Sequence, residues 1–179
     1  MKSLRLIFVA IILTLFGSGA NADYEAGVNA AFNGDFDTAF LEFSTAAEAG
    51  LDVAQYNLAI LYFTGQGVDQ DFELAFKWTE AAALQGHVNA QFNLGSLYFD
   101  GNGVEQSNIL GIEWFKSSGR AGHAGAAFAL AEMFREGQRV SKGLVEAHAW
   151  AAKAVANAHE NGLILKEEIE EDLSPSQLN

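Results

Sequence analysis

Apolar positions recur along most of the chain at the spacing of an α-helix. Ala54, Leu58 and Leu61 lie at i, i+4 and i+7, so they share one face. Gly65 follows them, and glycine can take the left-handed conformation that ends a helix at little steric cost. Asp71 is suited to cap the start of a second helix. The pattern predicts two helices joined by a glycine turn.

This helix pair is repeated. A shift of 36 residues superposes the chain on itself without a gap over three copies, which indicates a repeat architecture. Each copy has matching small, apolar and aromatic positions: Ala54, Ala90 and Ala126; Leu58, Leu94 and Leu130; Tyr62, Tyr98 and Phe134; Gly65, Gly101 and Gly137; Val68, Val104 and Val140; Trp78, Trp114 and Trp150. One large tryptophan facing small residues in each copy predicts an all-α solenoid of antiparallel helix pairs.

The repeat divides the chain into consecutive segments. We expect a signal peptide at 1–22, an N-terminal partial repeat at 23–50, repeats at 51–86, 87–122 and 123–158, and a C-terminal capping helix at 159–179. The partial repeat is recognised from Ala39, Ala46 and Gly50, which match Ala75, Ala82 and Gly86.

The N-terminus has the three-part layout of a secretory signal peptide. Lys2 and Arg5 precede an apolar run, and a small-residue ending at Ala20–Ala22 predicts cleavage before Asp23. The alternative is an uncleaved membrane anchor, but the run is shorter than the roughly 20 residues that cross a bilayer. We therefore expect a periplasmic or secreted protein, with no membrane span after cleavage.

The segment AQYNLAILYFTGQGVDQDFELAFKWTEAAALQG resembles a Sel-one-like repeat, a relative of the tetratricopeptide repeat. The resemblance runs from about Gly27 to Ala158 and rests on the alanine, NL pair, tyrosine, G-x-G-V turn, tryptophan and closing glycine. It implies a right-handed superhelix and adaptor or scaffold roles. Secreted members linked to penicillin binding have a cysteine pair in each repeat, and this chain lacks those cysteines.

The third copy departs from the repeat at three positions. Arg139 replaces the second turn glycine, Gly143 replaces the capping aspartate, and Ala158 replaces the closing glycine. These departures leave open whether the third copy keeps the turn geometry of the others.

Charge and composition exclude several kinds of chemistry. A formal net charge of −13 disfavours nucleic-acid binding, and the absence of cysteine excludes disulfides, thiolate nucleophiles and cysteine-held metals. No serine-nucleophile, phosphate-loop or zinc-binding histidine motif is present. We predict no catalytic site, no metal site and no cofactor. We interpret His87 and His123 as exposed turn residues repeated by duplication.

An acidic run, Lys166-Glu167-Glu168 and Glu170-Glu171-Asp172, lies on one side of an expected helix whose other side has Leu165, Ile169 and Leu173. A terminal repeat needs a polar outer face, so the run is interpreted as a cap. The alternative is a site for a cation or a basic partner.

A candidate binding groove lies on the first helix of each repeat, where polar residues would be expected opposite the core face. The positions are Tyr56, Asn57, Ile60, Phe63, Phe92, Asn93, Phe99 and Phe128. On the concave wall of a solenoid, Tyr56, Phe92 and Phe128 would form an aromatic ladder beside two asparagines that could bond a peptide backbone. Alternatively, these rings pack between neighbouring helices.

We therefore predict a non-enzymatic adaptor or scaffold that holds a peptide or helix of another protein in its concave groove. One alternative is a β-lactam-binding or cell-wall enzyme. Another is an assembly subunit anchored at the inner membrane by its N-terminus. The sequence leaves the identity of the partner and the oligomeric state open.

Overall fold

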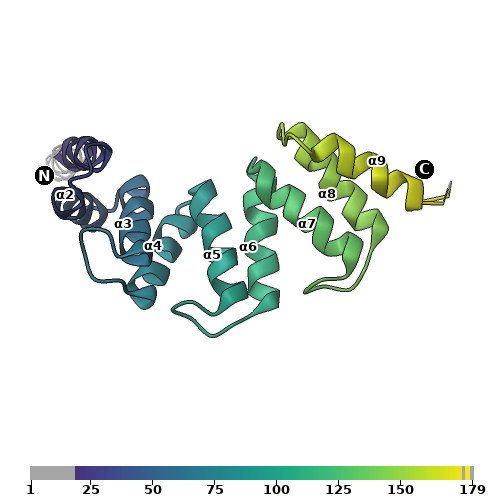
Figure 1. The fold of residues 1–179 in the computed structure, drawn as a ribbon, viewed down its shortest axis with the longest axis horizontal. Coiled ribbons are helices and arrows are strands. Elements are labelled where there is room, and N and C mark those ends of the chain that lie inside the picture. Colours follow the sequence, from purple (N-terminus) through teal and green to yellow (C-terminus); the bar gives the residue numbers. More distant parts are fainter. Residues whose placement is uncertain (1–18, 175, 178–179) are drawn as a thin grey trace, which may run out of the picture. The chain divides into compact units, whose positions relative to one another are not determined.

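The structure is a computed structural model that describes residues 19–174 and 176–177. Helices joined by short turns account for most of this part of the chain (Figure 1). A first helix spans 19–32 and is followed by α2 (Phe36–Glu48), α3 (Asp52–Thr64), α4 (Phe72–Leu84), α5 (Val88–Asp100), α6 (Asn108–Arg120), α7 (Ala124–Glu136), α8 (Leu144–Ala156) and α9 (Gly162–Asp172). The predicted all-α solenoid fold with its 36-residue repeat is confirmed. Residues 1–18 of the expected signal peptide lie outside the described residues.

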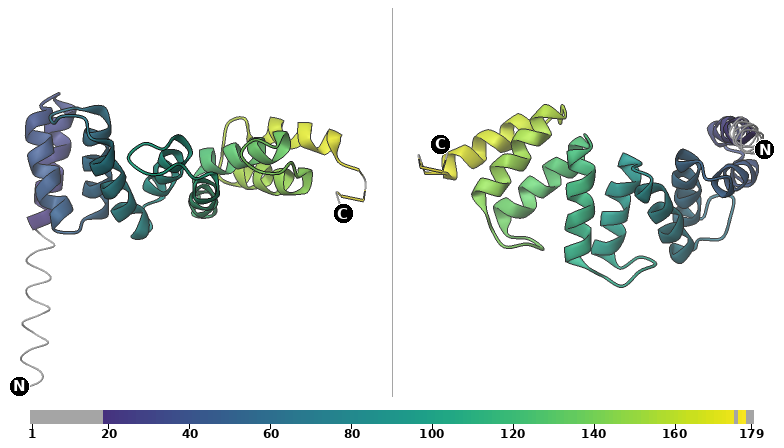
Figure 2. Two further views of the ribbon diagram at one scale, coloured as in Figure 1. Left: turned by 90° about the horizontal axis from the view of Figure 1, so that it is seen from below. Right: turned by 180° about the vertical axis from the view of Figure 1, so that it is seen from behind.

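The chain forms two compact units, one ending at His87 and the other beginning at Val88. Within each unit, successive helices lie side by side and run in alternating directions (Figures 1 and 2). In unit 1, alanines of α2 pack with Leu58 and Leu61 of α3, and Trp78 covers this cluster. In unit 2, Leu130 and Ile169 are fully buried, and Trp150 packs against both of its clusters.

Side-chain caps begin the second helix of several pairs, as the sequence predicts. The Asp71 carboxylate accepts a hydrogen bond from Leu74 N at 2.9 Å, and Ser107 Oγ accepts one from Leu110 N at 3.3 Å. Asp35 caps α2 in the same way through Thr38 N. Each cap satisfies one of the free N–H groups at a helix start, so the caps fix where these helices begin.

The third repeat keeps the turn geometry of the other two. Arg139 has a φ of 61°, close to the 70° of Gly67, and Gly137 ends α7 in the left-handed region like Gly65 after α3. Arg139 Nη1 also donates to the carbonyl oxygen of Phe99 at 3.0 Å. The non-glycine residue therefore adopts a strained conformation that its own hydrogen bond helps to hold.

In both units, a glycine on one helix of a pair leaves room for an aromatic side chain of the other helix. A Cβ on Gly27 would lie 2.6 Å from Cδ1 of Phe43, and one on Gly95 would overlap the ring of Phe115. Gly27 and Gly95 thus make room for a phenylalanine from the following helix of the chain. Gly111 does the reverse and makes room for the ring of Phe99. Large-into-small packing of this kind fills the helix interfaces.

The last helix, α9, covers the end of unit 2. Its apolar side chains Leu165 and Ile169 are buried, whereas its acidic side is tied to the two helices before it. Glu168 pairs with Arg135 of α7 at 2.5 Å, and Glu170 pairs with His148 of α8 at 2.8 Å. These contacts favour the cap interpretation of the acidic run.

Candidate protein-binding surface

Unit 1 has a cleft of about 360 Å³ between helix 19–32 and α3. Apolar side chains from three helices dominate its lining: Tyr24, Val28 and Ala31 of helix 19–32, Phe36 and Phe43 of α2, and Ile60 and Leu61 of α3. Asn57 of α3 and Gln66 of the following turn add polar groups. Helix 19–32 and α3 are the first helices of successive pairs.

Two of the predicted groove residues, Asn57 and Ile60, line this cleft. Asn57 Nδ2 donates to the Tyr24 hydroxyl oxygen at 3.4 Å, so one amide N–H is already used within the protein. The two side chains bridge the cleft from opposite helices. A partner would meet an apolar surface with a polar pair across it.

The other predicted residues of unit 1 pack away from the cleft. Tyr56 is half-buried, and its ring stacks on His87 with centroids 4.5 Å apart. Phe63 is 40% exposed and meets Phe72 of α4 edge to face at 5.3 Å. Neither residue belongs to the cleft lining.

In unit 2 the predicted groove rings are largely packing residues. Phe92 lies between Phe115, at a centroid distance of 4.7 Å, and His123, at 4.5 Å. Phe128 stacks on His159 at 4.1 Å, and Asn93 is half-buried on α5. The alternative weighed for the sequence, packing between helices, describes these rings better than an open aromatic ladder.

Placing Phe99 in the groove is wrong. The side chain is only 4% exposed and lies in a core cluster with Ile112, Phe115 and Leu130. Its ring fits over Gly111, where a Cβ would overlap it. Because Gly111 has no side chain, the Phe99 ring has room to pack into the core.

Interpreting His87 and His123 as exposed turn residues is also wrong. Both are half-buried, and each stacks on an aromatic ring that lies 31 residues earlier in the chain. His123 is the N-cap of α7, because its Nδ1 accepts a hydrogen bond from Ala126 N at 3.0 Å. Burial lowers the pKa of His123, and burial also lowers that of His87 against an opposing effect of Asp52.

Sequence reasoning missed the half of the cleft that belongs to helix 19–32. The turn after this helix is short, so its register differs from the 36-residue repeat. A shift of 32 aligns Tyr24 with Tyr56 and Val28 with Ile60. That second shift is the signal that could have found Tyr24 and Val28.

Unit 1 is strongly acidic. Residues 19–87 contain 11 acidic side chains and one basic side chain, Lys77. Lys77 lies on α4 with its Nζ 5.7 Å from the ring of Trp78. Since residues 19–87 contain a single lysine and no arginine, most carboxylates in this range have no lysine or arginine within it to pair with.

Neither a metal site nor a membrane span is found in residues 19–174 and 176–177. No group of three or more histidine, aspartate or glutamate side chains comes together there as a metal site would require. No helix among the described residues is both long and apolar enough to cross a membrane.

Comparison with known proteins fits the repeat and the fold. The Sel1 repeat matches residues 52–87, 88–123 and 124–163 in direct succession. The chain belongs to the Sel1 repeat family. Sel1 repeat proteins generally mediate protein–protein interactions, their fold is typically a non-enzymatic scaffold, and they are often extracytoplasmic.

Two solved structures share the fold. One is a protective antigen present in uropathogenic Escherichia coli strains and displaying an SLR fold, with a TM-score of 0.73 and 33% identity over 82% of this chain. The other is a Sel1 repeat protein from Oxalobacter formigenes, with a TM-score of 0.72 and 27% identity over 78% of this chain. The chain spans 33% and 57% of those two chains. A search of curated proteins found no match.

Proposed function

We propose that this Sel1 repeat protein is an exported, non-enzymatic adaptor that binds a segment of a client protein in the cleft of unit 1. The observation that carries the proposal is the apolar cleft between helix 19–32 and α3, with Val28, Asn57 and Ile60 in its lining. Val28 is 40% exposed, which is ample for a partner to reach it. Apolar clefts framed by a few polar groups are typical binding sites.

Export is the second part of the proposal and rests on the N-terminal sequence. Cleavage before Asp23 would leave Tyr24, and with it the whole cleft lining, in the mature protein. Mass spectrometry of the protein recovered from cells tests this, since the expected mass begins at Asp23. A mass that includes Met1–Ala22 would favour the inner-membrane-anchored alternative.

Binding is tested by site-specific photo-crosslinking in living bacteria. A photoreactive residue at Val28 should give discrete products of higher mass, whereas one at Leu84 should not. Leu84 is a matched control because it is 71% exposed, lies in the same unit and is outside the cleft lining. An additional Ile60→Lys substitution should abolish the Val28 products, because a buried, unpaired ammonium in the cleft is costly.

Circular dichroism and thermal melting of Ile60→Lys must show a folded chain for this result to count. Identical products from Val28 and Leu84 would contradict a specific cleft. The enzyme alternative is tested separately by turnover of a chromogenic β-lactam with purified protein, and we expect no turnover.

A further inference from the structure

The cleft of unit 1 continues onto a strongly exposed apolar surface. Phe32, at the end of helix 19–32, is 90% exposed, and it follows Val28 by four residues, so the two side chains share one helix face. An exposed phenylalanine beside an apolar cleft extends the surface that a partner could cover. It can provide a second anchor point outside the cleft.

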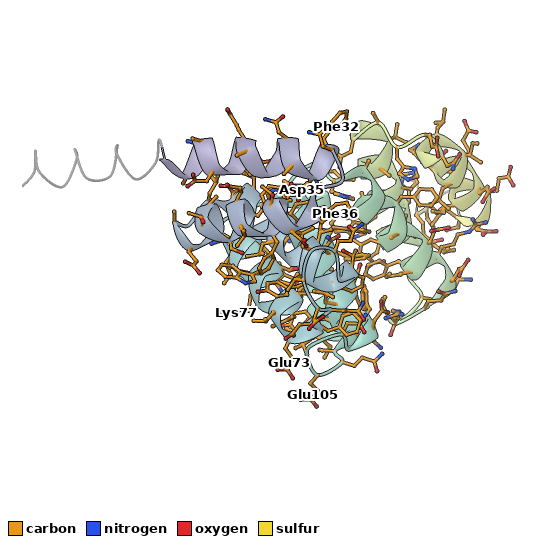
Figure 3. All side chains as sticks on the ribbon, turned by 60° about the vertical axis from the view of Figure 1, so that its left-hand side comes forward. Phe32, Asp35, Phe36, Glu73, Lys77 and Glu105 are labelled. Carbon is orange, nitrogen blue, oxygen red and sulfur yellow. The ribbon has the colours of Figure 1, made fainter. Side chains whose placement is uncertain are left out.

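Carboxylates border this apolar surface. Glu25 lies three residues before Val28 on the same helix and is exposed. Asp35 and Asp37 flank the cleft residue Phe36, and both are exposed. Figure 3 shows Phe32, Asp35 and Phe36 close together at the turn that leads into α2. The hydrogen bond from Thr38 to Asp35 lowers the pKa of this carboxyl group, so it stays charged.

Among residues 19–87, no lysine or arginine offsets this charge at the cleft; the α-amino group that cleavage before Asp23 would expose is the one cation expected close to Glu25. Lys77, the only lysine or arginine in residues 19–87, lies on α4, and α4 supplies none of the cleft lining. Figure 3 places Lys77 well away from Phe32 and Asp35. A partner that brings basic groups to the rim would therefore find carboxylates that are not neutralised from within the unit.

The geometry of the walls favours a helical partner. Both walls of the cleft are helices, whose backbone groups are hydrogen-bonded internally, so no strand edge is present there to pair with an extended peptide. The α3 wall has 13 residues and is about 20 Å long. A helix of about three to four turns matches this length and can pack on the exposed faces of both walls by ridge-into-groove contacts.

We propose that the cleft binds a cationic amphipathic helix of a partner protein. Its apolar side chains would enter between Val28 and Ile60 and cover Phe32, and its lysine or arginine side chains would meet Glu25, Asp35 and Asp37. The proposal rests on the proposed function and adds the chemistry of the segment that is bound.

The test uses three labelled 14-residue peptides and the full mature chain. The first peptide has leucine at i, i+3, i+4 and i+7 with lysine elsewhere, the second replaces every lysine by glutamate, and the third scrambles the first. Fluorescence anisotropy should show binding of the first peptide at least tenfold tighter than of either control. Ile60→Lys, checked for folding, should lose this preference.

A matched pair of charge reversals tests the rim. Glu25→Lys should weaken binding of the lysine peptide about fivefold at low ionic strength, and high salt should reduce this difference. Glu73→Lys makes the same change on an exposed residue of α4, which supplies none of the cleft lining, and should have no effect. Equal effects of the two variants would overturn the proposal, and so would equal affinity for the lysine and glutamate peptides.

The two proposals can fail separately. If Val28 crosslinks a client in cells and Ile60→Lys abolishes the crosslink, but the lysine peptide does not bind better than its controls, the adaptor proposal stands and the cationic-helix proposal is wrong. If no crosslink forms and no peptide binds, both are wrong.

Discussion

The two units are built from the same helix pair but use their surfaces differently. In unit 1 a cleft lined by Tyr24 and Ile60 lies between the first helices of the first two pairs. Residues 19–87 contain 11 acidic residues and one lysine. In unit 2, residues 88–179 contain 12 acidic and 7 basic residues, and ion pairs tie α7 and α8 to α9. Aromatic rings in unit 2 are stacked inside the unit.

The comparison indicates that the same repeat can serve internal packing in one unit and leave charged groups at the surface in the other. Successive helix pairs of unit 2 are joined by internal ion pairs and by ring stacks on His123 and His159. The polar and aromatic groups in these contacts are therefore less available to a partner.

Unit 2 also has a cleft, of about 430 Å³, but Lys116 and Lys142 line it beside Glu113 and Glu146. The cleft of unit 1 has carboxylates around it and no lysine or arginine of residues 19–87 in its lining. Groups that are not consumed by internal contacts are the ones available to a partner.

The largest expected effect compares the same turn position in the two units. A Cβ on Gly67 would overlap the carbonyl oxygen of Phe36, and its φ of 70° also disfavours any other residue. Gly67→Ala should therefore lower the free energy of unfolding by about 3 kcal/mol, because a clash adds to backbone strain. Urea denaturation followed by circular dichroism measures this loss.

Arg139→Ala is the matched change in unit 2, where a Cβ is already accommodated. It removes the hydrogen bond to Phe99 O and the contact of the guanidinium with the Phe99 ring, with 4.5 Å from Cζ to the centroid. We expect a loss of about 1 kcal/mol. If Gly67→Ala costs no more than Arg139→Ala, the turn of unit 1 is not as tightly packed as described here.

The repeat made the fold predictable, whereas the site depended on contacts that the repeat alone does not encode. Caps at Asp71 and Ser107 and the end of α3 at Gly65 follow from local rules and recur in register. Phe99 shares its repeat position with the exposed Phe63, and residues of the neighbouring helix distinguish the two: Gly111 and Phe115 stand where the first repeat has Ala75 and Thr79. Burial is set by such partners across the interface.

The sequence predicted residues of only one wall of the cleft, the α3 wall. Asn57 and Ile60 lie in a full repeat, whose helical pattern identifies their face. The opposite wall lies in a pair whose shorter turn breaks the 36-residue register, which obscures Tyr24 and Val28. The spacing of 31 residues between Phe92 and His123 was visible in the sequence, but stacking is a property of folded geometry.

An effect of intermediate size concerns pH and the His123 cap of α7. The neutral His123 ring accepts from Ala126 N, and protonation of Nδ1 would remove that acceptor. Because burial lowers its pKa in the folded state, the unfolded chain binds the proton more readily. The stability contributed by the neutral His123 ring is fully present above about pH 6.5, the usual pKa of histidine. It is lost as the pH falls through the lower pKa of His123 in the folded state.

His123→Asn keeps a capping side chain but cannot titrate in this range. Between pH 7.5 and 5, the wild type should lose about 1 kcal/mol more stability than the variant, which is the usual value of an N-cap. Urea denaturation at several pH values measures the difference. Identical pH profiles would show that His123 does not couple protonation to folding. In a nuclear magnetic resonance titration that keeps the chain folded, the pKa values of His87 and His123 should both lie below the usual value for histidine, because burial lowers each of them.

The smallest expected effect tests the closing turn of the third repeat. Ala158 has a φ of 61°, where the corresponding positions hold Gly50, Gly86 and Gly122, all with positive φ. The turn is nevertheless kept, because His159 N donates to Ala154 O at 2.9 Å, just as His123 N donates to Ser118 O. An alanine in the left-handed region costs about 1–2 kcal/mol, so the third repeat carries strain that the others avoid.

Ala158→Gly should therefore stabilise the protein by about 0.5 kcal/mol, since relief of strain exceeds the extra entropy that glycine gives the unfolded chain. Thermal melting should show a rise of about 1–2 °C for a chain of this size. Gly122→Ala is the reverse change at the equivalent turn, where a Cβ would meet nothing within 4 Å, so strain alone acts. It should lower stability by about 1 kcal/mol. If both substitutions shift the melting temperature in the same direction, backbone strain does not distinguish these turns, and other contacts of residue 158 must set its conformation.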